Sequence, residues 1–222
     1  MEHGNKGNQR RCEDAVMIKS SVATLFAGLL MGVSAVSAGS PVAKVGEAAP
    51  GFSLEDSDGK AHSLSDFQGR YVVLEWVNFG CPFVGKHYNS GNMQSLQRLY
   101  TAKGVIWLSI CSSAPGKQGF YEGEDLKEKI AEFKAAPTAY LTDPDGTVGK
   151  LYAAKTTPHM FVIDPRGTLV YDGGIDNIAS TDLEDIPKAE NYIKEVLDAA
   201  LAGKPLPLAT SRPYGCSVKY RS

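Results

Sequence analysis

The feature of this sequence that most constrains its fold is an apolar run that ends in a glycine, a cysteine and a proline. Residues 71–79 are aliphatic or aromatic apart from Glu75 and Asn78. Such a run is typical of a strand buried on both faces. Pro82 suits the first position of a helix, so Cys81 is predicted to lie at the junction between a central strand and a helix.

Strand and helix patterns alternate after this junction. The first helical segment contains Gly85 and a glycine at position 91, which predict a kink or break. Alternation of strands with helices predicts parallel pairing in one sheet. The predicted segments are a helix from Pro82 to about Ala102, a strand at 105–111, a helix at 124–135, a strand at 140–142 and a short helix at 148–153.

Two hairpins and a last helix complete the predicted domain. Residues 52–54 and 61–64 flank a turn at Gly59, and we expect this hairpin to precede the main sheet. A second hairpin joins 160–163 to 168–171, and an apolar stripe predicts a helix over 187–202. The expected fold class is α/β, with a mixed central sheet flanked by helices, an N-terminal hairpin and an inserted βα element.

The N-terminal residues 1–38 have the pattern of a signal peptide. A short basic lead precedes an apolar stretch at 22–33, and small residues follow at 36–38. If this segment is cleaved as a signal peptide, the protein is predicted to be exported, to the periplasm or the outside of the cell. An uncleaved membrane anchor is the alternative, because the apolar stretch approaches the ~20 residues needed to span a bilayer. Met17 is an alternative start. The remaining chain is predicted to be one domain at 39–204 and a tail at 205–222.

The charge pattern excludes some partners. The formal net charge is −2, and no basic run predicts binding to nucleic acid or to an anionic membrane, so a membrane role depends on an uncleaved N-terminus. No nucleotide, flavin or haem motif is present, and no cofactor is predicted. Paired His or Cys spacings typical of metal sites are also missing from the sequence.

Cys81 is the candidate reactive group. Its predicted place is the carboxyl edge of a parallel sheet, where active sites collect. Unpaired N–H groups at a helix N-terminus favour a thiolate over a thiol. A small buried thiol without chemistry is the alternative. Cys12 leaves with the leader, so Cys111 and Cys216 are the other thiols of the mature chain.

The run Leu74–Val84, together with Thr157-Pro158 and the ββα ending, resembles the thioredoxin superfamily. The resemblance covers residues 44–203 and is closest to the AhpC/TSA-type, peroxiredoxin-like redoxins. It implies a thioredoxin-like fold and a thiol-dependent oxidoreductase. It also implies that Thr157 and Pro158 form the cis-proline loop that faces the active cysteine, and that Glu75 matches a buried carboxylate able to shuttle protons.

Two departures from the family patterns affect the mechanism. Thioredoxin's second cysteine is replaced by Val84, and the Thr and Pro that precede a peroxiredoxin's cysteine are replaced by Asn78 and Leu74. Exchange requires a second attacking thiolate, so Cys81 needs a distant partner. Cys216, in the flexible segment 213–220, is the predicted resolving thiol. Cys111 competes for that role but is expected to lie in the core.

Positive groups near the site are also considered. Lys86 and His87 follow Cys81 in the predicted helix, and we expect both to be solvated. His159 is better placed, beside Pro158.

The predicted function is reduction of a peroxide by the Cys81 thiolate, an antioxidant activity in which a distant cysteine resolves the oxidised thiol. The alternative is thiol–disulfide exchange with a protein substrate. Either reaction needs an external dithiol protein as reductant. A second alternative is a protein without turnover, either a thioredoxin-fold binding protein or a copper carrier using Cys81, Cys111, His87 or His159.

Overall fold

The computed structural model of the protein describes Met1 and residues 42–221. The predicted signal peptide at 1–38 and the alternative start at Met17 lie outside the described residues. Within residues 42–221, no helix combines the length and the apolar character that crossing a bilayer requires.

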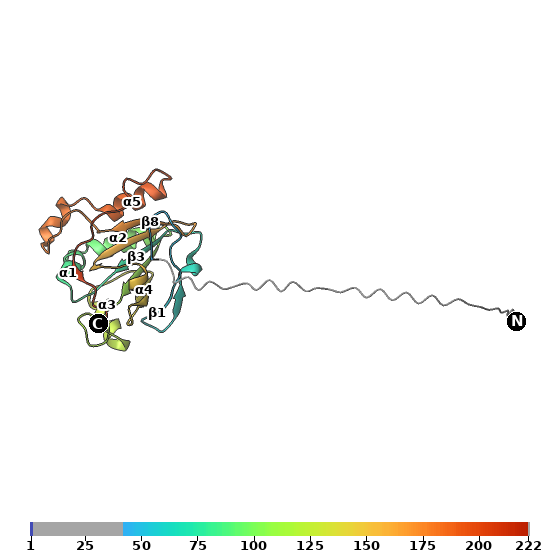
Figure 1. The fold of residues 1–222 in the computed structure, drawn as a ribbon, viewed down its shortest axis with the longest axis horizontal. Coiled ribbons are helices and arrows are strands. Elements are labelled where there is room, and N and C mark those ends of the chain that lie inside the picture. Colours follow the sequence, from blue (N-terminus) through green and yellow to red (C-terminus); the bar gives the residue numbers. More distant parts are fainter. Residues whose placement is uncertain (2–41, 222) are drawn as a thin grey trace, which may run out of the picture. The chain divides into compact units, whose positions relative to one another are not determined.

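A seven-stranded mixed sheet forms the centre of the fold (Figure 1). Its strand order is β2-β1-β5-β4-β3-β7-β8, with β3, β4 and β5 parallel to one another and β7 antiparallel to β3 and β8. The strands are β1 (Ser53–Asp56), β2 (Ala61–Ser63), β3 (Val72–Trp76), β4 (Ile106–Cys111), β5 (Ala139–Thr142), β7 (His159–Ile163) and β8 (Leu169–Gly173). The prediction of parallel pairing along the strand–helix alternation is confirmed.

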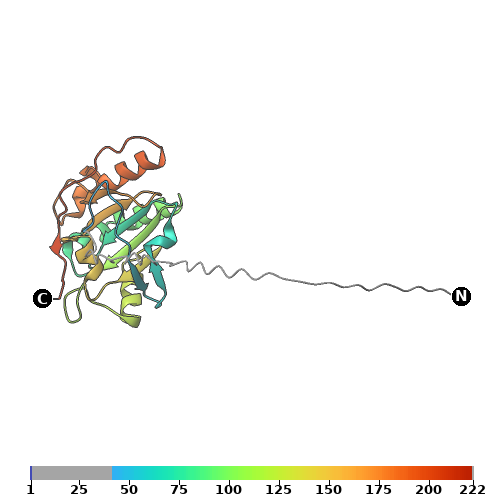
Figure 2. The ribbon, with the colours of Figure 1, turned by 45° about the vertical axis from the view of Figure 1, so that its right-hand side comes forward.

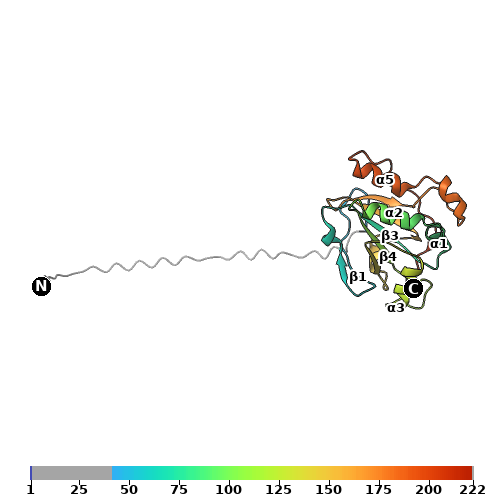
Figure 3. The same cartoon turned by 180° about the vertical axis from the view of Figure 1, so that it is seen from behind.

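Helices cover both faces of this sheet (Figures 2 and 3). Every residue of β3 is buried, and alternate side chains enter two separate cores, so Val73 packs on one face and Leu74 on the other. The first core is built with residues of α1, α2, α3 and α5, and the second with residues of α4 and η1. The helices are α1 (Pro82–Asn89), α2 (Asn92–Thr101), α3 (Gly123–Glu132), α4 (Thr147–Leu151) and α5 (Tyr192–Leu201), with the 3₁₀ turns η1 (Leu64–Phe67) and η2 (Leu183–Lys188).

This is the thioredoxin-like arrangement that the resemblance implied, with differences at its ends. The N-terminal hairpin does not precede the main sheet but joins it, because β1 pairs with β5. The last helix begins at Tyr192 rather than at residue 187, since Pro187 lies in η2 and the Asn191 side chain caps the helix by accepting from the Lys194 N–H at 2.9 Å. The predicted helix break is confirmed at Gly91, whose φ is 76°.

The C-terminal segment 209–220, here called the strap, packs along the domain and past α1 (Figure 1). Its first part is anchored where the Gly174 N–H donates to Ser211 Oγ at 2.9 Å. Its last part is anchored where the Tyr220 hydroxyl donates to the Ala154 carbonyl at 2.8 Å. Between these anchors, β9 (Cys216–Ser217) pairs with β6 (Thr156–Thr157) in a small antiparallel sheet. The residue at position 216 is therefore held from both sides.

Candidate active site

Cys81 lies at the carboxyl edge of the sheet, just after β3, and forms the N-cap of α1. Its backbone N–H donates to the Asn78 carbonyl at 2.9 Å, and its own carbonyl accepts from the Gly85 N–H at 2.9 Å. Pro82 occupies the first turn, where no hydrogen bond is lost. The side chain is only 1% exposed, so the thiol lies in a covered site.

Thr157 and Pro158 face this thiol. The peptide bond between them is cis, as the resemblance implied. The protonated Cys81 thiol donates to the Thr157 carbonyl, with Sγ and oxygen 3.1 Å apart. The Thr157 hydroxyl is buried and makes no hydrogen bond to the described part of the chain. It is therefore available to donate to a thiolate at Cys81.

Cys216 is brought to the same place by the strap. It is the register partner of Thr157 in the β6–β9 pair, and it is partly exposed. The structure thus brings together the two cysteines that lie furthest apart within residues 42–221. Cys81, at the helix N-terminus, is buried, and Cys216 is partly exposed.

The two thiols have opposed pKa shifts. Burial alone would raise the pKa of Cys81, but donors from the Cys216 thiol, the Val84 N–H and Thr157 outweigh it and lower that pKa below its usual value. Burial, together with the hydrogen bond and charge of Cys81, raises the pKa of Cys216 to about 11. Cys81 is therefore the thiol of the pair that ionises more readily, and the raised pKa of Cys216 favours its protonated form.

Cys111 lies in the core, as expected. Its side chain is 7% exposed, and its thiol donates to the Gly119 carbonyl with a sulfur–oxygen distance of 3.4 Å. Burial raises the pKa of Cys111, so a thiolate is disfavoured there. Position therefore favours Cys216, held beside Thr157 by the β6–β9 register, over Cys111 as the neighbour of Cys81.

Glu75 is fully buried among hydrogen-bond donors. Its carboxylate accepts from the Tyr88 hydroxyl at 2.9 Å and from the indole N–H of Trp107 at 2.8 Å. Gln97 and Ser109 donate to it at 3.0 Å and 2.8 Å. Burial raises the pKa of Glu75 despite these donors. These hydrogen bonds link β3 to β4, α1 and α2. Proton transfer by Glu75 stays a prediction.

The expectation that Lys86 and His87 are solvated is wrong, because α1 turns both side chains under the strap. Lys86 is 1% exposed and His87 is 0% exposed. Both face Asp176, whose carboxylate oxygen lies 3.7 Å from Lys86 Nζ and 3.9 Å from His87 Nε2. No periodic pattern or motif in the sequence indicates a role for Asp176. The last predicted positive group, His159, pairs with Asp172 at 2.7 Å.

A cavity of ≈ 530 Å³ lies beside the strap, next to the thiol pair. Thr156 and Gly215 line it close to the cysteines, and Asp176, Arg212 and Tyr214 line it further away.

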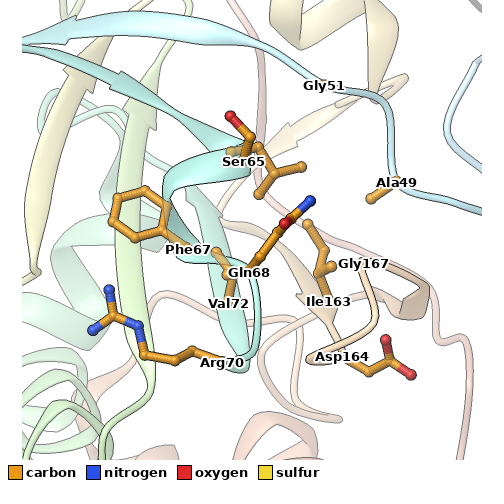
Figure 4. Close-up of a pocket in the computed structure, with 11 residues that line it drawn as sticks. Ala49, Gly51, Ser65, Phe67, Gln68, Arg70, Val72, Ile163, Asp164 and Gly167 are labelled. Atoms are coloured by element: carbon orange, nitrogen blue, oxygen red, sulfur yellow. The ribbon is translucent and has the colours of Figure 1, made fainter. Parts of the chain in front are cut away.

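A smaller cavity of ≈ 170 Å³ lies at the opposite edge of the sheet, among Phe67, Val72 and Ile163 (Figure 4). It is remote from the thiols, because Val72 begins β3 and Cys81 follows its end. Residues 42–221 contain no cluster of three or more His, Cys, Asp or Glu side chains arranged to hold a metal ion.

Two solved structures share the fold over most of the chain. An uncharacterized conserved protein from Geobacillus kaustophilus superposes with a TM-score of 0.68 at 29% identity, covering 80% of this chain and 93% of that one. A hypothetical protein from Sinorhizobium meliloti 1021 superposes with a TM-score of 0.65 at 23% identity, covering 81% and 96%.

Curated relatives and a family match agree with this fold. The thiol-disulfide oxidoreductase ResA of Bacillus thuringiensis is 28% identical over 131 residues, which are 58% of this chain and 69% of the relative. ResA of Bacillus subtilis is 24% identical over 144 residues, 62% and 71% of the two chains. Residues 45–172 match the AhpC/TSA family. That match spans more than half of the sequence and includes Cys81 and the cis-proline loop, and the chain belongs to the AhpC/TSA family.

Proposed function

We propose that the protein is a thiol–disulfide oxidoreductase whose redox centre is the pair Cys81 and Cys216. The observation that carries this proposal is the placement of Cys216 against the Cys81–Thr157 contact by the β6–β9 register. The opposed pKa shifts of the two thiols support a division of roles. The curated relatives, which are thiol-disulfide oxidoreductases, support the same class of reaction.

The reaction follows as two exchanges. The Cys81 thiolate attacks a substrate disulfide, forming a mixed disulfide and releasing one substrate thiolate. Cys216 then loses its proton and attacks the Cys81 sulfur, forming the Cys81–Cys216 disulfide and releasing the second substrate thiolate. The substrate has gained two electrons, and an external dithiol protein returns them to the pair. Because Cys216 is the more exposed sulfur, we expect the reductant to attack it first.

Reduction of a peroxide is the second candidate, and it is favoured by the burial of Cys81. A hydroperoxide reaches a thiol that is 1% exposed more readily than a folded protein's disulfide does. The Cys81 thiolate would take one peroxide oxygen to become a sulfenic acid, and Cys216 would condense with it to release water. Both candidates end in the same disulfide and differ only in the oxidant.

Export belongs to this proposal. The pattern of residues 1–38 and the need for a persistent disulfide both suit an oxidising compartment outside the cytoplasm. Fusion of these residues to a reporter enzyme that is active only after export tests the point.

One preparation of the reduced protein can distinguish the two candidates. We expect insulin disulfides to be reduced, in the presence of a dithiol reductant, faster than hydrogen peroxide is consumed. Peptide mapping of the oxidised protein is expected to show one disulfide between Cys81 and Cys216, with Cys111 free. Faster peroxide consumption would favour the second candidate, and a stable sulfenic acid at Cys81 with Cys216 free would contradict the resolving role.

A further inference from the structure

A buried polar cluster lies between α1 and the strap, outside the thiol pair. It consists of Lys86 and His87 from α1, Asp176 from the loop after β8, and Tyr214 from the strap. The Tyr214 hydroxyl donates to Asp176 Oδ1 at 2.5 Å, and His87 Nε2 lies 3.1 Å from the same hydroxyl. Lys86 donates to the Ile178 carbonyl at 2.8 Å and lies 3.7 Å from the Asp176 carboxylate.

The hydrogen bonds in this cluster have a defined direction. The side-chain amide nitrogen of Asn92 donates to His87 Nδ1 at 2.8 Å, which leaves the ring proton on Nε2. Burial, and secondarily the charge of Lys86, lowers the pKa of His87 to about 3, so the ring is neutral. His87 therefore donates to the Tyr214 oxygen, and Tyr214 donates to Asp176. The charges that remain are the Lys86 ammonium and the Asp176 carboxylate, which balance.

The cluster joins the two elements that carry the thiols. Cys81 caps the N-terminus of α1, five residues before Lys86, while Tyr214 lies two residues before Cys216 on the strap. The Tyr214 ring also packs edge-on against Phe83, with ring centroids 5.9 Å apart, inside the turn that follows Cys81. The position of the Tyr214 backbone relative to α1 therefore helps to set the separation of the two sulfurs.

Stability alone does not account for these groups. Lys86 and Asp176 side chains are 0% and 2% exposed, and a buried ion pair is often no more stabilising than apolar residues of similar size. Such a pair does fix geometry, because an unpaired charge left by any displacement is costly. Displacing Tyr214 would remove one hydrogen bond from Asp176 and one from His87 together.

We propose that Tyr214, held by Asp176 and His87, is a positioning residue that sets Cys216 against Cys81 for formation of their disulfide. This rests on the proposed function of the pair. Ring closure between two groups is fast only when both are held in a productive geometry, and small misplacements reduce its rate strongly. The cluster supplies that constraint from the α1 side, and the β6–β9 hydrogen bonds supply it from the other side.

Tyr214→Phe is the direct test, because it removes the hydroxyl and keeps the ring that contacts Phe83. After addition of one equivalent of a small-molecule disulfide, we expect the Cys81–Cys216 disulfide of this variant to form about tenfold or more slowly than that of the wild-type protein. Mass analysis of quenched samples measures this rate of closure. In a Cys216→Ser background, the first attack by Cys81 should proceed at the same rate with and without Tyr214→Phe. The pKa of Cys81 should rise as the Cys216 hydrogen bond weakens. The absorbance of the thiolate measures this pKa, with Cys81→Ser as the blank.

Two further variants control the test. Tyr192→Phe removes a phenolic hydroxyl from the wall of the same cavity and should leave closure unchanged. Asp176→Asn keeps an acceptor for Tyr214 but leaves the buried Lys86 ammonium without its counter-charge, so it should lower the stability of the protein as well as slow closure. Closure at the wild-type rate in a folded Tyr214→Phe protein would overturn the positioning role, as would equal slowing of the first attack. If the wild-type protein forms no Cys81–Cys216 disulfide, the proposed function itself fails.

Discussion

Cys81→Ser should abolish the proposed thiol chemistry, lowering the rate of disulfide reduction at least about a thousandfold, because neither of the other two thiols in residues 42–221 ionises as readily. Cys111 has a raised pKa and a covered thiol, and Cys216 has a pKa of about 11. Cys216→Ser should behave differently: the first attack still occurs, and the protein stops as a mixed disulfide with its substrate. Steady-state insulin reduction and mass analysis of the trapped species measure the two outcomes.

Cys111→Ser is the matched control for these variants, since it removes a thiol of the same domain that lies in the core. It should retain the wild-type rate. Full insulin-reducing activity in Cys81→Ser would instead show that Cys81 is not the attacking thiol. Full steady-state turnover in Cys216→Ser would show that an outside thiol resolves Cys81.

Gly215→Ala should displace the strap from the site. Gly215 has φ of 137°, a region that side chains rarely adopt, and a β-carbon there would lie 2.0 Å from the Thr157 carbonyl oxygen. That oxygen belongs to the backbone of β6 and cannot move aside alone. We expect β9 to separate from β6, a loss of stability of roughly 1–3 kcal/mol from overpacking, and slower closure of Cys81–Cys216. Alkylation of Cys81 should become at least about tenfold faster as the cover opens.

Gly51→Ala is the control for Gly215→Ala, because a β-carbon at Gly51 meets no atom within 4 Å. Urea unfolding, alkylation followed by peptide mapping, and closure kinetics should all match the wild-type protein. If Cys81 in the Gly215→Ala variant is alkylated at the wild-type rate, the strap does not cover this thiol.

Most of the fold could be predicted from local patterns. The β3 run is apolar apart from Glu75, so its burial on both faces could be predicted from consecutive residues. The break at Gly91 is likewise local, since a positive φ favours glycine. The pairing of β1 with β5 could not be predicted, because it joins segments far apart in sequence with no pattern that selects one edge over another. The last helix was predicted to start too early because a proline suits a 3₁₀ turn as well as a first helical turn.

The site was predictable only in part. The strand and helix patterns around Cys81, together with Pro82, indicate its position. Cys216 was predicted as its partner because it lies in a flexible segment that can fold back onto the domain. Nothing local indicates that Lys86 and His87 are buried, since charged helix residues are ordinarily solvated. Their burial depends on Asp176 and Tyr214, which come from two later segments, so only the tertiary structure reveals the cluster.

Because the strap crosses α1, the redox state of the two thiols would also affect the stability of the whole domain. A bond between Cys81 and Cys216 closes a loop that contains the strands from β4 to β8 and the helices from α1 to α5. Closing a loop on the order of 100 residues restricts the unfolded chain enough to contribute roughly 4–5 kcal/mol in the chain-entropy description. Each cycle of the proposed reaction would therefore switch the domain between a cross-linked, more stable form and a reduced, less stable form. The thermal unfolding temperature would then report the fraction of the protein that is oxidised.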